Sequence, residues 1–126
     1  MKEKYITALK VEPMKKPVVV SLENEFHALQ EAVSIGSEYR GLLECIGVEE
    51  GVEILLNEEG KLMGLDPNRY FRDDILCGVF YVVGIDGAHF VSLAQDKIEK
   101  YMDIFRTPQQ FLAVDDSVFI LNIEDA

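Results

Sequence analysis

Residues 75–93, "ILCGVFYVVGIDGAHFVSL", give the clearest indication of the fold. Positions 75–85 form the most continuously apolar run in the chain, as expected for a strand that is buried on both faces. Asp86-Gly87 is a strong signal for a tight turn, so residues 89–93 are predicted to return as the antiparallel partner. We therefore expect a central strand at 75–85 that continues into a hairpin.

Further strands are expected on both sides of this centre. Alternating and β-branched residues indicate strands at 5–13 and 18–22, and a hairpin is expected around the turn at 48–51. Glu59-Gly60 is expected to turn the chain again, so that residues 61–65 form the second strand of another hairpin. Near the C-terminus, "QQFLAV" and "SVFILNI" flank Asp115-Asp116, and the second of these runs is predicted to be the last strand.

Two helices are predicted. The first has its apolar residues on one stripe, and Gly36 is expected to stop it. Ser21 or Asn24 is expected to cap its N-terminus. The second starts with capping-box spacing at Ser92 and Gln95 and ends before Pro108. The stripe of the first helix consists of Phe26, Leu29, Ala32 and Val33.

These elements predict an α+β fold with a mixed, mostly antiparallel sheet and two helices packed on it, because the helices fall singly between runs of strands. With 126 residues and 48% hydrophobic residues, we expect one domain over 1–126. No apolar run is long enough to span a membrane, and the first residues lack the apolar core of a signal peptide. We therefore expect a cytoplasmic protein. Cys45 and Cys77 lie in apolar runs, where buried, inert thiols are the usual outcome.

The net charge of −11 argues against direct binding of nucleic acid or of an anionic membrane. The acidity is concentrated, because residues 17–60 contain ten glutamates and a single cation, Arg40. One interpretation is a solvated face, and the other is a surface that occupies a basic groove on a partner protein. The residues that we expect to form such a contact surface are Glu44, Glu49, Glu50 and Glu53.

The sequence contains no recognisable catalytic motif. Neither His27 nor His89 lies in a recognisable nucleophile setting, and no phosphate loop, metal-ligand spacing or cofactor motif is present. We therefore expect no catalytic residues, no metal and no cofactor, and a protein that is not an enzyme.

The segment "EEGKLMGLDPNRYFRDD", residues 58–74, is the best candidate for a ligand site. If residues 68–74 form a turn of helix, two arginines lie on one face and can hold a phosphate or carboxylate. The structural alternative is a turn in which Arg69 pairs with Asp66, Asp73 or Asp74. The candidate ligand-binding residues are Asn68, Arg69, Arg72, Lys61 and Tyr70.

The same segment carries a family resemblance. "KVEPMKKP" at 10–17, "NEEGKLMGLDPNRYF" at 57–71 and the apolar strand that follows resemble a family of small uncharacterised proteins of phages, plasmids and integrative elements of Gram-positive bacteria. The resemblance covers about residues 8–106, and residues 107–126 look like a C-terminal strand extension. Asp66 and Pro67 depart from the "GLP" that such proteins often have. The resemblance provides a biological context and no mechanism.

Two functions follow as expectations. The first is a non-enzymatic binding protein of a phage or mobile element, which inhibits host defence by binding a host protein in the host cytoplasm through its acidic surface. The second is a module that binds or sequesters a small anionic ligand, such as a nucleotide signal, at the Asn68–Arg72 segment. An apolar edge strand at the C-terminus also makes a homodimer possible.

Overall fold

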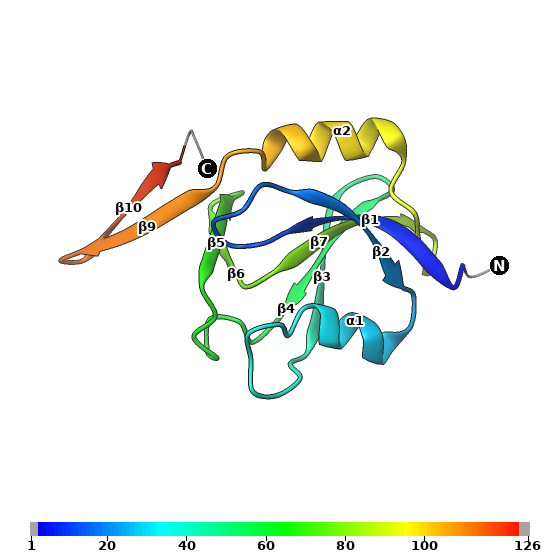
Figure 1. The fold of residues 1–126 in the computed structure, drawn as a ribbon, viewed down its shortest axis with the longest axis horizontal. Coiled ribbons are helices and arrows are strands. Elements are labelled where there is room, and N and C mark those ends of the chain that lie inside the picture. Colours follow the sequence, from blue (N-terminus) through cyan, green and yellow to red (C-terminus); the bar gives the residue numbers. More distant parts are fainter. Residues whose placement is uncertain (1–2, 124–126) are drawn as a thin grey trace.

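The computed structural model describes residues 3–123 and shows ten strands and two helices in that range (Figure 1). The helices are α1 (Phe26–Ala32) and α2 (Gln95–Ile104). The strands are β1 (Tyr5–Val11), β2 (Val18–Glu23), β3 (Leu43–Glu49), β4 (Val52–Asn57), β5 (Pro67–Phe71), β6 (Asp74–Cys77), β7 (Phe80–Asp86), β8 (His89–Val91), β9 (Gln109–Val114) and β10 (Ser117–Asn122).

The main sheet is antiparallel and has the order β2-β1-β7-β4-β3, with β8 paired to the end of β7. Strand β7 lies at its centre, and its first five residues are buried, as predicted for residues 80–85. The predicted strand at 75–85 is nevertheless two strands. Gly78 has a φ of 81°, which interrupts the extended backbone, so that β6 separates from β7 and pairs with β5 in a sheet of its own.

The two faces of the sheet build two apolar clusters. Phe80 and Val82 of β7 pack with α2 and with the β5–β6 hairpin on one face. Tyr81 and Val83 pack with α1 on the other face, so the two helices lie on opposite sides of the sheet (Figure 1). The predicted α+β class, with mostly antiparallel strands and two helices, is consistent with this architecture. The predicted mixed sheet is not found, because every strand pair in residues 3–123 is antiparallel.

The predicted hairpin at 59–65 is wrong. Residues 58–64 form successive turns, and the chain turns back between β5 and β6 instead. Arg72 and Asp73 make that turn, with φ values of 50° and 63°. Two consecutive residues with positive φ suit the right-handed twist of a hairpin, although Asn-Gly is the usual choice for them. Residues 68–74 therefore form a hairpin and not the predicted turn of helix.

The helix caps also differ from the prediction. Glu25 is the N-cap of α1, where its carboxylate accepts a hydrogen bond from the backbone N–H of Ala28. Asn24, a predicted cap, is buried and donates hydrogen bonds to the carbonyls of Glu3 and Phe90. Ser92 does not cap α2, because its hydroxyl accepts a hydrogen bond from the N–H of Thr7.

Strands β9 and β10 form a hairpin that extends away from the rest of the structure (Figure 1). We call this hairpin, residues 109–122, the C-terminal arm. The last strand is predicted at residues 117–123, and β10 (Ser117–Asn122) confirms this prediction. Of the helices in the described part of the chain, neither is long and apolar enough to cross a membrane.

Candidate functional site

Asn68 and Arg69 of β5 are buried at the junction of several distant segments, with relative exposures of 0% and 2%. The Arg69 guanidinium donates five hydrogen bonds of 2.7–3.2 Å, all to oxygens of amide groups. Their acceptors are the carbonyl of Lys15 in the β1–β2 loop, the carbonyl of Phe105 at the end of α2, and both oxygens of Asn68.

Asn68 extends this brace to the centre of the sheet. Its Nδ2 donates to the carbonyl of Val11 at 2.9 Å and to the carbonyl of Gly78 at 2.8 Å. The Asn68–Arg69 pair, which we call the buried brace, therefore ties together the ends of β1 and α2 and the link between β6 and β7. Burial lowers the pKa of Arg69 to about 10, so the guanidinium is still charged at neutral pH.

This geometry corrects both predictions for Arg69. A ligand cannot reach its donors without displacing the backbone carbonyls that they bind. The predicted pairing with Asp66, Asp73 or Asp74 is also absent, because the structure over residues 3–123 contains no ion pair to Arg69. Asn68, predicted to orient a ligand, instead orients Arg69.

The other predicted ligand residues do not converge on one site. Lys61 forms an ion pair of 2.5 Å with Asp74, whose carboxylate raises the pKa of Lys61. Tyr70 is exposed and donates its hydroxyl hydrogen to Asp73 at 2.9 Å. Arg72 donates to the carbonyl of Val48 and lies over the ring of Phe71. The predicted cationic group is thus dispersed around the β5–β6 hairpin.

The predicted acidic contact surface is divided as well. In the β3–β4 register, Glu44 and Glu49 pair with Leu56 and Val52, whose side chains face α2. Glu53 pairs with Val83, which belongs to the opposite face of the sheet. Glu50 lies in the exposed turn that follows β3. These four residues therefore do not form one continuous patch.

The carboxylate of Glu49 accepts hydrogen bonds from three side chains of α2. Its oxygens accept hydrogen bonds from Lys100 at 2.7 Å, from Lys97 at 2.6 Å and from the hydroxyl of Tyr101. The hydrogen bonds from Lys100 and then Lys97 are the main reason that the pKa of Glu49 is lowered to about 2. This residue thus attaches α2 to the edge of the sheet.

The cysteines differ from the prediction in part. Cys45 lies exposed on the outer strand β3, and Cys77 is half-buried. Partial burial, together with the nearby carboxylates of Glu53 and Glu44, raises the pKa of Cys45. The reactive thiolate form of Cys45 is therefore disfavoured. Within residues 3–123, no three potential metal ligands gather around a common point.

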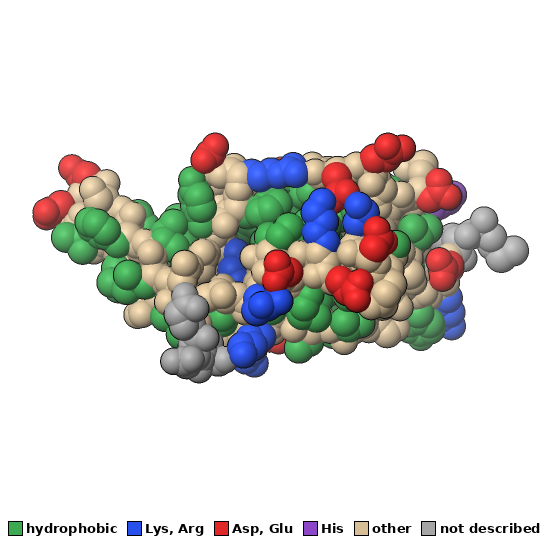
Figure 2. Space-filling model, turned by 90° about the horizontal axis from the view of Figure 1, so that it is seen from above, with side chains coloured by type: hydrophobic (Ala, Val, Ile, Leu, Met, Phe, Trp, Pro, Cys, Tyr) green, Lys and Arg blue, Asp and Glu red, His purple; other side chains and the backbone are tan. Residues whose placement is uncertain are grey.

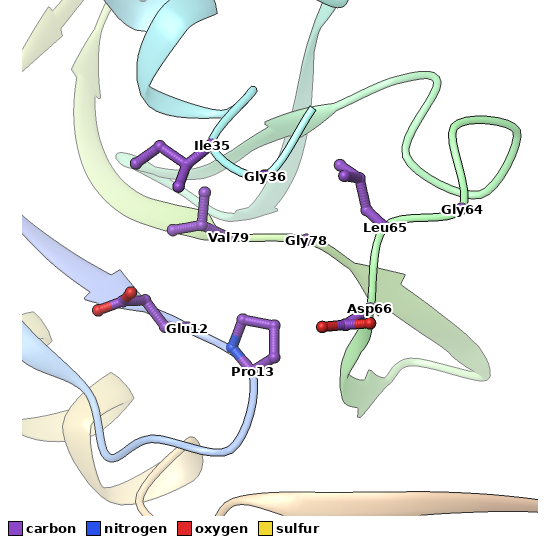
Figure 3. A pocket seen from close by; sticks show the side chains of 9 residues that line it. All are labelled: Glu12, Pro13, Ile35, Gly36, Gly64, Leu65, Asp66, Gly78 and Val79. Atoms are coloured by element: carbon purple, nitrogen blue, oxygen red, sulfur yellow. The ribbon is translucent and has the colours of Figure 1, made fainter. Parts of the chain in front are cut away.

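A cleft of about 250 Å³ opens beside the buried brace (Figure 3). We call it the acidic cleft, because Glu12 and Asp66 contribute its charged side chains. Figure 3 shows that four parts of the chain line it, namely the end of β1, the loop after α1, the segment before β5 and the segment between β6 and β7. Its lining consists of Glu12, Pro13, Ile35, Gly36, Gly64, Leu65, Asp66, Gly78 and Val79.

The cleft combines a negative charge with an apolar wall. The carboxylate of Asp66 has no hydrogen bond or ion pair with any residue of the described chain. The Glu12 carboxylate oxygens lie 3.8 Å from the Nζ of Lys10 and 3.7 Å from the Nζ of Lys15. Both distances are longer than the roughly 2.7–2.9 Å of a charge-assisted hydrogen bond. Ile35, Leu65 and Val79 provide apolar surface beside these acids.

The buried brace positions this cleft. Asn68 holds the carbonyls of Val11, next to Glu12, and of Gly78, which lines the cleft. The N–H of Gly78 donates to the carbonyl of Asp66 at 2.7 Å. No motif in the sequence predicts Glu12 and Asp66 as site residues. Their signal was their position in the two segments, 10–17 and 57–71, that carry the family resemblance.

Comparison with protein families gives one match. The family model "Domain of unknown function (DUF3846)" matches residues 6–106. No curated protein and no solved structure matches the chain. The acidic cleft and the buried brace lie inside the matched residues, whereas the C-terminal arm lies outside them.

Proposed function

The chain belongs to the DUF3846 family, and from the geometry of its cleft we propose that it is a non-enzymatic binding protein that takes a basic side chain of a partner protein between Glu12 and Asp66. The observation that carries this proposal is the position of Asp66, a solvent-exposed residue whose carboxylate has no partner in the described chain and lies beside the apolar wall of the cleft. A carboxylate in such a position favours a cation that brings its own hydrogen-bond donors.

Arginine and lysine side chains fit this combination. Each has an apolar stem that packs against aliphatic side chains and a charged end that stays with the acids. The volume of about 250 Å³ agrees with one side chain, because pockets for small molecules usually measure roughly 300–1,000 Å³. The net charge of −11 supports the same class of partner, since it attracts basic surfaces over a distance.

The biological setting that we propose comes from the resemblance. Accessory genes of mobile elements often encode small acidic proteins that antagonise host defence, commonly by occupying the nucleic-acid groove of a host nuclease. We propose this role here, with a basic surface of a host protein as the target and no direct contact with nucleic acid or membrane. The contact surface is the acidic cleft and its surroundings, in place of the divided set Glu44, Glu49, Glu50 and Glu53.

The nucleotide alternative has less support. Of the five residues expected to hold an anion, Asn68 and Arg69 are buried in the brace. Lys61 lines a cavity of about 110 Å³ together with its partner Asp74, and this volume is too small for a nucleotide. Arg72 and Tyr70 line neither this cavity nor the acidic cleft.

Capture of partners from a host lysate tests the proposal when it is made quantitative with matched variants. Glu12→Gln with Asp66→Asn removes two charges from the cleft. Asp86→Asn with Glu99→Gln removes the same charge from exposed positions elsewhere. We expect the cleft variant to lose a basic partner that the wild type and the control retain, and we expect that binding to weaken with salt. Equal capture by all three proteins, or binding indifferent to salt, would reject the proposal.

A further inference from the structure

A second depression adjoins the acidic cleft and is bordered by the C-terminal arm. Its volume is about 440 Å³, and it shares Pro13 and Asp66 with the cleft. Figure 3 shows these two residues opposite each other at one end of the cleft. We call this depression the arm groove. Besides the two shared residues, its lining consists of Met14, Pro67, Gln109, Gln110 and Phe111.

Hydrogen bonds at the base of the arm fix the outer wall of the groove. The Oε1 of Gln109 accepts from the N–H of Tyr70 on β5 at 2.8 Å, and its Nε2 donates to the Oδ1 of Asn122 at 3.0 Å. Phe111 lies on the same face of β9 as Gln109, and both are half-buried, whereas Gln110 between them is exposed. Figure 2 shows hydrophobic side chains along the arm. The outer wall is therefore apolar and preformed, as is usual for binding sites.

Met14 forms part of the inner wall in a strained conformation. The N–H of Lys15 donates to the carbonyl of Glu12 at 3.2 Å, which closes a turn with Pro13 and Met14 at its centre. Met14 has a φ of 63°, a value that glycine usually provides at the second central position of a type II turn. Its side chain is nevertheless 49% exposed, so burial within the fold does not explain it. Strain of this kind is typical of ligand-binding positions, and methionine adapts well to apolar ligands.

Charge and spacing select the occupant. Asp66 lies between the two depressions, and none of the described residues that line them is Lys or Arg, so a cationic ligand is favoured over an anionic one. Side chains at positions i and i+2 of an extended chain point to the same side and lie about 6.5 Å apart. One such chain can therefore fill two neighbouring depressions. The exposed amide of Gln110 offers both a donor and an acceptor to the backbone of that chain.

On the basis of the function proposed for the cleft, we propose that the partner binds through an extended segment in which an apolar side chain, two residues from the basic one, enters the arm groove. The basic side chain occupies the acidic cleft, and the apolar one packs between Met14 and Phe111. The family match ends at residue 106, so the outer wall belongs to the part of the chain beyond the matched residues. The arm thereby adds a selection for partner sequence to the cleft of the family core.

Peptide titrations followed by two-dimensional ¹⁵N–¹H NMR test this proposal separately from the function of the cleft. The probes are acetyl-Gly-Arg-Gly-Leu-Gly-amide and the reversed order acetyl-Gly-Leu-Gly-Arg-Gly-amide, because the proposal gives a spacing and no direction. Their controls carry serine in place of leucine. We expect leucine in at least one order to tighten binding roughly 10-fold, which is the gain that burial of one leucine side chain allows. The leucine peptide should also shift the amide signals of Gln110 and Phe111, and the serine peptide should not.

Met14→Gly and Phe111→Ala each remove one apolar wall of the groove. Both are expected to reduce the ratio of the serine to the leucine dissociation constant from roughly 10 toward 1. Met14→Gly also relieves the strained turn, so its melting temperature should not fall, and loss of structure cannot account for its effect. Leu112→Ala is the matched control for Phe111→Ala, because Leu112 lies on the opposite face of β9, and it should retain the full ratio.

The outcomes separate this proposal from the one on which it rests. Serine peptides that shift the signals of the cleft, without tighter binding by leucine in either order, overturn the role of the arm groove and leave the function of the cleft intact. Absence of binding by all four peptides overturns both. A gain from leucine that Met14→Gly and Phe111→Ala retain, or that Leu112→Ala also loses, overturns the role of the arm groove as well.

Discussion

Replacing Arg69 with methionine is expected to destabilise the protein strongly, although it removes a charge from a buried position. Methionine retains the apolar stem and the approximate length of arginine, and it cannot donate a hydrogen bond. The substitution leaves four acceptors without their present donor, the carbonyl oxygens of Lys15, Asn68 and Phe105 and the side-chain oxygen of Asn68.

The magnitude follows from those acceptors. A buried acceptor that loses its partner costs about 1–3 kcal/mol, and release of the guanidinium from its buried position offsets part of the sum. We therefore expect a loss of about 3–5 kcal/mol, which is a large fraction of the roughly 5–15 kcal/mol that stabilises a typical domain. The corresponding fall in melting temperature is about 10–20 °C for a chain of this length.

Urea denaturation followed by far-UV circular dichroism measures this loss. Arg72→Met is the control, because Arg72 is exposed and donates a hydrogen bond to one carbonyl, that of Val48. We expect it to cost less than about 1 kcal/mol. Since the pKa of Arg69 is about 10, the difference between wild type and Arg69→Met should not change between about pH 6 and pH 8. An Arg69→Met protein as stable as the control would refute the role assigned to the buried brace.

Two other predictions concern the edge of the sheet and the wall of the cleft. The folded pKa of Glu49, about 2, lies below the ordinary value of 4.5 because of hydrogen bonds led by Lys100, so its contribution to stability is complete above pH 4.5 and is lost toward pH 2. The stability difference between wild type and Glu49→Gln in urea should therefore close over that range, and a constant difference would contradict the pairing. Gly78→Ala should lower the melting temperature more than Gly87→Ala. Both glycines have a positive φ, but only the new Cβ at position 78 would meet a neighbour, at 2.8 Å from the Leu65 side chain. Equal melting temperatures would contradict the close packing at Gly78.

The sequence predicts the parts of the fold whose signals are local. The apolar run and Asp86-Gly87 are sufficient to place β7 and its hairpin with β8, because burial and turn geometry act over a few residues. The β5–β6 hairpin was missed because Arg72 and Asp73 occupy a turn that usually requires Asn or Gly. Its position is held by contacts with residues far along the chain, which no local pattern contains.

The candidate site was harder to predict for the same reason. Arginine is rarely buried without an acidic partner, so the sequence predicts that Arg69 binds an anionic ligand or pairs with Asp66, Asp73 or Asp74. Besides the adjacent Asn68, its partners are backbone carbonyls 54 and 36 residues away in the sequence. The acidic cleft likewise arises where the end of β1 meets the loops near Gly36 and Leu65. The sequence drew attention to residues 57–71, and in the fold Asn68 and Arg69 of this segment are buried while Asp66 lines the cleft.

A titration followed by two-dimensional ¹⁵N–¹H NMR tests the central claim, that the acidic cleft binds a basic side chain, most directly. The probe is the peptide acetyl-Gly-Arg-Gly-amide, and its control has citrulline, an uncharged isostere, in place of arginine. We expect the arginine peptide to shift the amide signals of Gly36, Gly64 and Gly78, which line the cleft, while Gly87 at the far turn stays unchanged. The shifts should weaken with salt and in Asp66→Asn. Absence of shifts at the three glycines, or equal shifts with the citrulline peptide, would contradict the account.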